Sequence, residues 1–191
     1  MKPGSLLSVF LLFGAAFAEQ PPIAIVYEFE QEPTAGSYSA LVEETQTLLD
    51  PAGIRVVWRK QGSQSGSESF SQVVFVRYKG ACRTSLGTAP DADFETVRLG
   101  AARVESGRVL PVAEVDCTEI RRFLDAAPAR QRALTLGRAL ARVTAHELYH
   151  VLLRTTAHGR DGLSKATVGT AELGSRHFAF HQDEIQRFNR R

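Results

Sequence analysis

The sequence has little of several features, and each shortage excludes a class of protein. Its 23 basic residues nearly balance its 21 acidic ones, and no lysine- and arginine-rich tract is interleaved with aromatics, which argues against a nucleic-acid partner. No apolar run reaches the ~20 residues that span a bilayer, so we expect no stable membrane insertion. A chain of 191 residues is long enough for one domain with a real core and too short for two ordinary ones.

The N-terminus has the features of a secretory signal peptide. Lys2 supplies a positive charge, residues 6–18 form a short apolar segment, and an Ala-Phe-Ala cleavage site stands before Glu19. We therefore expect a signal peptide at residues 1–18, a mature chain of residues 19–191, and a secreted or periplasmic protein. The alternative is an N-terminal membrane anchor, against which the shortness of the apolar segment argues.

The chain has only 2 cysteines, Cys82 and Cys117. In an oxidising compartment an even pair of cysteines favours a disulfide, and only one connectivity exists. Two buried free thiols are the alternative.

The first part of the mature chain alternates strand and helix patterns. Residues 23–30 are apolar and β-branched and then alternate in polarity, which predicts a strand. Residues 38–49 carry apolar side chains at helical spacing, with Ser37 as the expected N-cap, and residues 54–58 predict a second strand. This β-α-β order places the two strands parallel in one sheet.

The rest of the chain adds strands and then helices. Further strands are predicted at 72–79, 97–104 and 109–115, a short helix at 118–124, a long helix at 129–153 and a final helix at 182–189. This order predicts a single α+β (α/β-like) domain with a twisted mixed sheet of about five strands, a backing helix and a long helix.

The long helix has an apolar stripe that includes Leu136, Leu140 and Leu148. Arg138 and Arg142 fall on the opposite side, which we expect to face solvent.

The C-terminal end of this long helix reads His146-Glu147-Leu148-Tyr149-His150. At ~100° per residue the two histidines lie on one face, about 6 Å apart along the axis. Their imidazoles can therefore bind one Zn²⁺, and Glu147 lies close enough to take a proton from a water that the metal activates. The alternative is a chance match on an amphipathic helix, but the helix, the apolar stripe and a further histidine favour a zinc site.

A catalytic zinc needs a third protein ligand and one open position. The first candidate is His158, because Gly159 after it suits a tight turn back toward the helix. An exposed loop histidine is the alternative interpretation. Glu172 is the rival ligand, although residues 170–174 do not show a helical pattern, and Asp161 is a weaker one.

The segment HELYHVLLRTTAH followed by Gly162-Leu163 resembles the metzincin clan, whose pattern is H-E-x-x-H-x-x-G-x-x-H with a later Met-turn. It looks most like a group of secreted bacterial metzincin-like proteins with a longer gap before the third histidine. The order of the predicted elements also matches the upper half of a metzincin domain. The resemblance implies Zn²⁺ held by His146, His150 and His158.

The chain departs from the clan pattern in three ways. The gap between the second and third histidines is two residues longer than usual, and Leu153 and Arg154 stand where a glycine is expected. Leu163-Ser164 stands in place of the Met-turn methionine, since Met1 is the only methionine. That methionine packs beneath the metal and is not a ligand, so its absence does not remove zinc.

These features together predict a secreted zinc metallopeptidase of metzincin type. Glu147 would act as general base on a metal-activated water. The resemblance implies that the edge strand, residues 97–104, pairs with an extended peptide or protein substrate. We expect a monomer. The alternative is a catalytically weak or inactive zinc-binding module that holds a protein or peptide partner, against which the presence of Glu147 argues.

Overall fold

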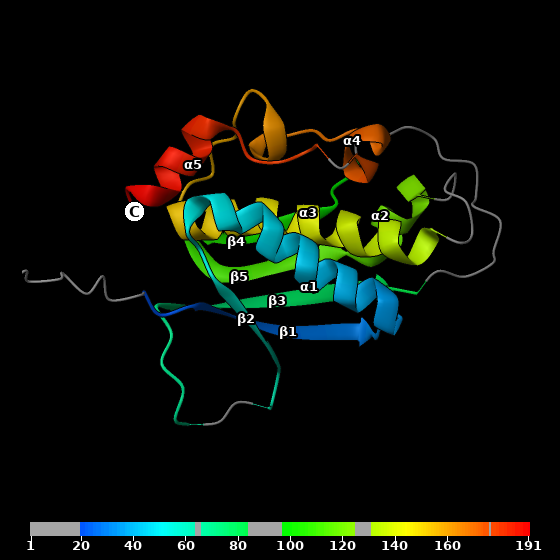
Figure 1. Cartoon of the computed structure of the whole chain (residues 1–191), viewed down its shortest axis with the longest axis horizontal. Helices are drawn as coiled ribbons and strands as arrows, with labels where there is room; N and C mark the ends of the chain where they lie inside the picture. The colour runs from blue at the N-terminus through cyan, green and yellow to red at the C-terminus, as the bar shows by residue number, and fades with distance from the viewer. Residues whose placement is uncertain (1–19, 64–65, 84–96, 125–130, 176) are drawn as a thin grey trace, which may run out of the picture.

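A computed structural model describes residues 20–63, 66–83, 97–124, 131–175 and 177–191 of the chain (Figure 1). The expected signal peptide lies outside these residues. The elements are β1 (Ile23–Gln31), α1 (Ala35–Leu49), β2 (Val56–Lys60), β3 (Gln72–Ala81), β4 (Gly100–Glu105), β5 (Arg108–Asp116), α2 (Cys117–Leu124), α3 (Arg132–Leu153), α4 (Thr170–Gly174) and α5 (Gln182–Asn189). Two short 3₁₀ turns are η1 (Asp50–Ala52) and η2 (Gly162–Ser164).

The strands form one five-stranded mixed sheet in the order β2-β1-β3-β5-β4. β1 pairs in parallel with both β2 and β3, and β3 pairs in parallel with β5. β4 runs antiparallel to β5 and lies at the edge of the sheet. The predicted fold class, a single α+β domain with a mixed sheet of about five strands, is confirmed, as is the parallel β-α-β unit.

Helix α1 begins earlier than the sequence suggests. Thr34 is the N-cap, and its Oγ1 accepts the Ser37 N–H at 3.2 Å, so the prediction of Ser37 as the cap is wrong. The helix ends before Gly53, whose φ of 63° allows the left-handed turn into β2.

In the β4–β5 hairpin, the first strand starts later than the sequence predicts. The strand begins at Gly100 and not at residue 97, and Leu99 just before it accepts the Asp116 N–H at its carbonyl at 2.8 Å. The turn between β4 and β5 has positive φ at both Ser106 and Gly107, as a type I′ hairpin turn requires.

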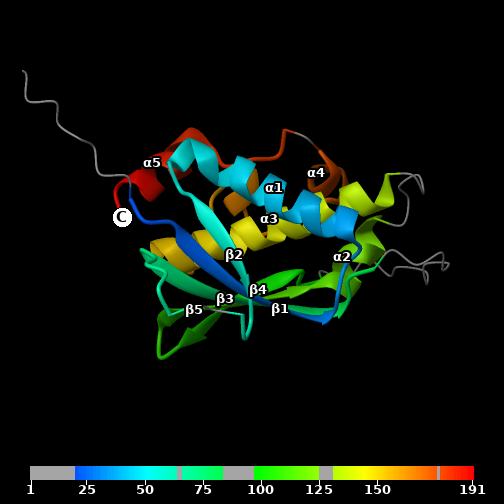
Figure 2. The same ribbon diagram turned by 60° about the horizontal axis from the view of Figure 1, so that its bottom comes forward.

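α1 and α3 lie on the same face of the sheet, and the core fills the space between these layers (Figure 2). The two helices touch at Gly137 of α3. A Cβ at this position would lie 2.6 Å from the Ala40 Cβ and 3.1 Å from the Leu41 nitrogen. Gly137 therefore allows α3 to lie close against α1.

The side of α3 away from the sheet is covered by the C-terminal segment that carries α4 and α5 (Figures 1 and 2). Arg142 lies on this side and is fully buried, so the prediction that it faces solvent is wrong. Its guanidinium donates to Glu44 of α1 at 2.7 Å and to the Leu173 carbonyl of α4. Residues 170–174 are helical, which also corrects the sequence-based interpretation.

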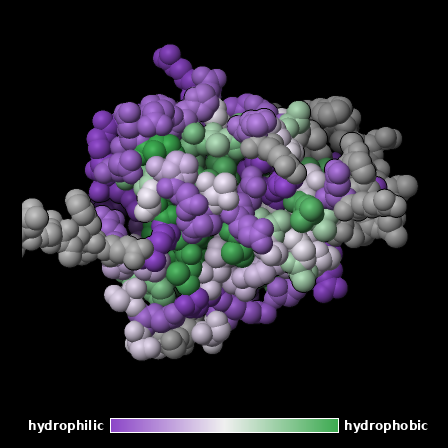
Figure 3. Space-filling view, in the orientation of Figure 1, coloured by the Kyte–Doolittle hydropathy of each residue, from purple (hydrophilic) through white to green (hydrophobic). Residues whose placement is uncertain are grey.

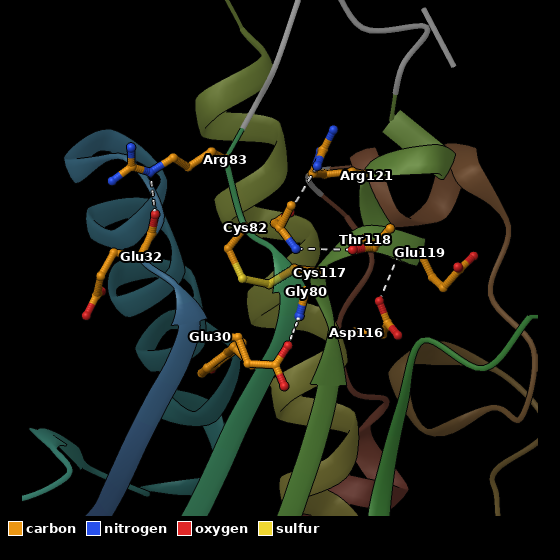
Figure 4. Close-up of a disulfide and its surroundings, with 12 residues drawn as sticks. Glu30, Glu32, Gly80, Cys82, Arg83, Asp116, Cys117, Thr118, Glu119 and Arg121 are labelled. Atoms are coloured by element: carbon orange, nitrogen blue, oxygen red, sulfur yellow. Dashed lines mark hydrogen bonds between the residues drawn. A yellow bond between two sulfur atoms is a disulfide. The ribbon is translucent and has the colours of Figure 1, made fainter. Parts of the chain in front are cut away.

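A disulfide joins the end of β3 to the start of α2 through Cys82 and Cys117, which are 35 residues apart in sequence (Figure 4). Both cysteines are fully buried. Beside them the Thr118 hydroxyl oxygen accepts the Ala81 N–H at 3.1 Å, and the Arg121 guanidinium donates to the Ala81 carbonyl at 3.2 Å. The chain is therefore cross-linked at the end of the sheet where β3 ends and α2 begins.

Within the described residues, no helix is long and apolar enough to cross a membrane. The space-filling view shows the apolar residues of one face as patches separated by polar side chains (Figure 3).

Candidate metal centre

The last two turns of α3 bring His146 and His150 together. Their Nε2 atoms are 3.1 Å apart, because residues four apart in a helix share a face. His150 is 6% exposed, whereas His146 is partly buried.

The chain reverses directly after α3 and brings His158 to the same place. Arg154 caps the helix in the left-handed conformation, with φ of 50°, at a position where glycine is the usual residue. The His158 ring centroid lies 5.3 Å from that of His146 and 4.7 Å from that of His150. One ligand atom from each of the three histidines lies within 4.8 Å of the others.

Two of the three imidazoles are oriented by backbone carbonyls. His146 Nδ1 donates to the Leu163 carbonyl at 2.7 Å, and His150 Nδ1 donates to the Thr155 carbonyl at 2.8 Å. Because a carbonyl can only accept, both rings carry their proton on Nδ1, and the Nε2 lone pairs face each other. Sequence analysis could not find these acceptors, since every residue has a carbonyl.

The two histidines of α3 are also in the protonation state that a metal requires. Burial lowers the pKa of His146 to about 4 and lowers the pKa of His150 as well. Both rings are therefore neutral near pH 7. Three imidazoles that converge on one point match the donor set of a catalytic Zn²⁺ with three protein ligands, so the residues present fit this metal.

Glu147 is 4% exposed and lies between α3 and the edge strand β4. Burial raises its pKa to about 7, opposed by the Ala102 backbone N–H and by the positive charge of Arg98. A Cβ at Gly100 of β4 would lie 2.7 Å from Glu147 Oε1, so glycine makes room for this carboxylate. Gly100 was not among the predicted site residues. Its only mark in the sequence is that it lies on a predicted edge strand.

Asp161 and Glu172 do not belong to the histidine cluster. Glu172 instead pairs with Lys165 at 2.5 Å and accepts the Gly169 N–H at 2.8 Å. The hydrogen bond from Lys165, followed by the one from Gly169, lowers the pKa of this carboxyl. Of the three candidate third ligands, the structure brings only His158 to the other two histidines.

The turn η2 lies next to the histidines and includes Leu163 and Ser164. Leu163 is 1% exposed, and its carbonyl is the acceptor for His146. Ser164 is fully buried, and its carbonyl accepts the Gly159 N–H at 3.0 Å. The turn therefore contacts one histidine directly and the residue next to another.

No protein family profile matches this sequence, and no curated protein is significantly similar to it. Among solved structures, the chain is similar to the crystal structure of archaemetzincin from Methanopyrus kandleri, with a TM-score of 0.54 and 13% sequence identity. The match covers 92% of this chain and 97% of that chain. The two proteins therefore share a fold over nearly their whole length.

Proposed function

We propose that this chain is a zinc-dependent peptidase that hydrolyses peptide bonds. The observation that carries this proposal is the placement of three histidines around one point, with the buried carboxyl group of Glu147 beside them. The likeness to an archaemetzincin in fold supports the same conclusion. Membership of a secreted bacterial metzincin-like group stays a prediction.

His146, His150 and His158 would hold the metal. Zinc at such a site supplies Lewis-acid chemistry, since it lowers the pKa of water and polarises a carbonyl group. Glu147 takes the proton of the attacking water and passes it to the leaving amine. Burial raises the pKa of this carboxyl group in the metal-free chain, and a carboxyl group with a raised pKa is suited to accept and return a proton.

The edge strand β4 would bind the substrate. Among the described strands, β4 pairs only with β5, so backbone groups on its other side can form hydrogen bonds to an extended peptide. Ala102 of β4 donates to Glu147, so a peptide along this edge would lie next to the proposed base.

We also propose that the protein is exported and cleaved after residue 18. The residue pattern of the N-terminus supports export, and a disulfide between Cys82 and Cys117 suits an oxidising compartment. The monomeric state stays a prediction.

Two substitutions test the ligands and the base separately. We expect His158→Ala to lose zinc, because two histidines remain at a site that needs three. The matched control is His177→Ala, at an exposed histidine outside the cluster, and it should keep a full complement. A His158→Ala protein with full zinc content would refute the ligand set.

Glu147→Ala should keep zinc and lose hydrolysis of an unfolded protein substrate by about 10²-fold or more. Zinc content and cleavage rate are measured on the same preparation. A variant that cleaves at the wild-type rate would refute the role of Glu147. A wild type that binds zinc but never cleaves would favour the zinc-binding module instead.

A further inference from the structure

Glu184 is a buried carboxyl group that the proposed chemistry does not use. It lies in α5, is 2% exposed, and accepts the His181 N–H at its Oε2 at 2.7 Å. Its other oxygen, Oε1, is buried and has no hydrogen-bond partner among the described residues. Buried polar atoms without a partner are rare in folded proteins and are destabilising, so this oxygen requires an explanation.

A second unpartnered oxygen lies close to the first. Ser164 of η2 is fully buried, and its hydroxyl also lacks a partner within the described part of the chain. Both oxygens face the Cα of Gly159. A Cβ at this glycine would lie 2.8 Å from Glu184 Oε1 and would collide with Ser164 Oγ. Side chains of η2 and α5 thus both approach Gly159, where a larger residue would not fit.

Gly159 and Ser164 are both connected to proposed metal ligands. Gly159 directly follows His158, and its N–H donates to the Ser164 carbonyl at 3.0 Å. One residue earlier in the same turn, the Leu163 carbonyl accepts from His146. Any contact that fixes the Ser164 side chain therefore also fixes the backbone that supports both ligands.

The segment that carries Glu184 is itself attached to the metal-binding helix. The Leu163 N–H donates to the Ala179 carbonyl at 3.0 Å. Arg187 of α5 donates to the hydroxyl of Tyr149, which lies between the two histidines of α3, at 2.9 Å. These bonds hold α5 against η2 and α3 and allow a carboxylate in α5 to act as a fixed support.

We propose that Glu184 is a positioning residue of the metal site. The Ser164 hydroxyl donates to Glu184 Oε1 after a rotation of either side chain, and this bond fixes the turn that orients His146 and holds the chain beside His158. The support that a methionine gives beneath the metal in metzincins would here come from a polar contact with the C-terminal helix. This inference rests on the proposed zinc site.

Two substitutions remove the contact from either side. Ser164→Ala and Glu184→Ala should each weaken zinc affinity by about 10–100-fold, the usual effect of losing an outer-shell partner. Affinity is measured by chelator competition on the purified protein. The visible absorption spectrum of the Co²⁺-loaded protein should change as well, because it reports the geometry of the ligands. Glu184→Gln should bind zinc nearly as the wild type does, because its amide nitrogen can donate to Ser164 Oγ.

Glu172→Ala is the matched control. Like Glu184, Glu172 accepts the backbone N–H of the residue before its helix, at 2.8 Å from Gly169, but it lies outside the histidine cluster. This variant loses a comparable cap and should keep the wild-type affinity and Co²⁺ spectrum. If Glu184→Ala fails to fold, Ser164→Ala decides, because it leaves the α5 cap intact.

The outcomes separate the inference from the proposed function. A wild type that binds no metal would refute the proposed function itself. A wild type that binds zinc, with Ser164→Ala and Glu184→Ala equal to it in affinity and spectrum, would overturn the positioning role alone. An equal loss in Glu172→Ala would also overturn it, since the effect would then follow from helix capping.

Discussion

Glu147 combines two properties that oppose each other at the scale of a single residue. Its burial against β4 raises its pKa to about 7, which suits proton transfer. The same burial makes the ionised form unfavourable in the folded, metal-free protein. Ionisation of Glu147 therefore reduces the stability of the apo protein.

We predict that Glu147→Gln stabilises the metal-free protein in a pH-dependent way. Burial raises the folded-state pKa of Glu147 from 4.5 to about 7. Below pH 4.5 the carboxyl group is protonated in both the folded and the unfolded chain, so its burial does not reduce stability. As the pH rises from 4.5 through 7, the unfolded chain loses the proton first and the folded state loses stability. Gln stays neutral, so the free energy of unfolding of the variant should exceed that of the wild type by up to about 3 kcal/mol once the pH has risen through this range. Urea unfolding in the presence of a chelator at pH 5 and pH 8 measures the difference.

The exposed carboxylate Glu28 provides the control for this measurement. Glu28→Gln should change the free energy of unfolding by less than about 0.5 kcal/mol at both pH values. An equal stability of Glu147→Gln and wild type at pH 8 would contradict the proposed cost of burying the charge.

Helix α3 shows at the scale of an element what a sequence pattern can and cannot predict. The spacing of the leucines and histidines predicts the helix and places His146 and His150 on one face. The pattern also places Arg142 away from the leucine stripe, but it cannot show that a later segment covers that side. The positions of Glu44 and the Leu173 carbonyl, which make the burial of Arg142 possible, depend on tertiary contacts.

We predict that Gly137→Ala destabilises the protein although alanine favours helices. The new Cβ would lie 2.6 Å from the Ala40 Cβ, so α1 and α3 must separate. Overpacking of this kind costs about 1–3 kcal/mol, which exceeds the roughly 1 kcal/mol gained in helix propensity. The matched control is Gly36→Ala in α1, where nothing lies within 4 Å and the propensity gain should remain. Thermal unfolding of both variants gives the result, and a stabilised Gly137→Ala protein would contradict the prediction.

At the scale of the whole molecule, the sequence predicts the layers well and the supports of the site poorly. The sheet and its β-α-β unit follow from local periodicity, which is why they could be predicted. His158 could be proposed from the turn-forming Gly159 after it. The roles of Gly100, Leu163 and Ser164 depend on segments that meet only in the folded chain, and no local pattern marks them.

The disulfide gives a prediction for the molecule as a whole. Cys82 and Cys117 are separated by 35 residues, and closing such a loop should stabilise the fold by ~3–4 kcal/mol. Reduction should therefore lower the urea midpoint of the wild type. The Cys82→Ala/Cys117→Ala protein should unfold at a lower midpoint and show no response to the reductant. A wild type whose midpoint ignores full reduction would argue against this contribution.

The carbonyl groups that orient His146 and His150 have a consequence for how this protein can vary. An acceptor that belongs to the backbone survives any substitution that preserves the path of the chain. A substitution of Thr155 that keeps the path of the chain therefore also keeps the carbonyl acceptor of His150. The side chains of this loop can therefore differ while the orientation of the two histidines stays the same. What must be kept is the backbone conformation, which a comparison of sequences does not detect.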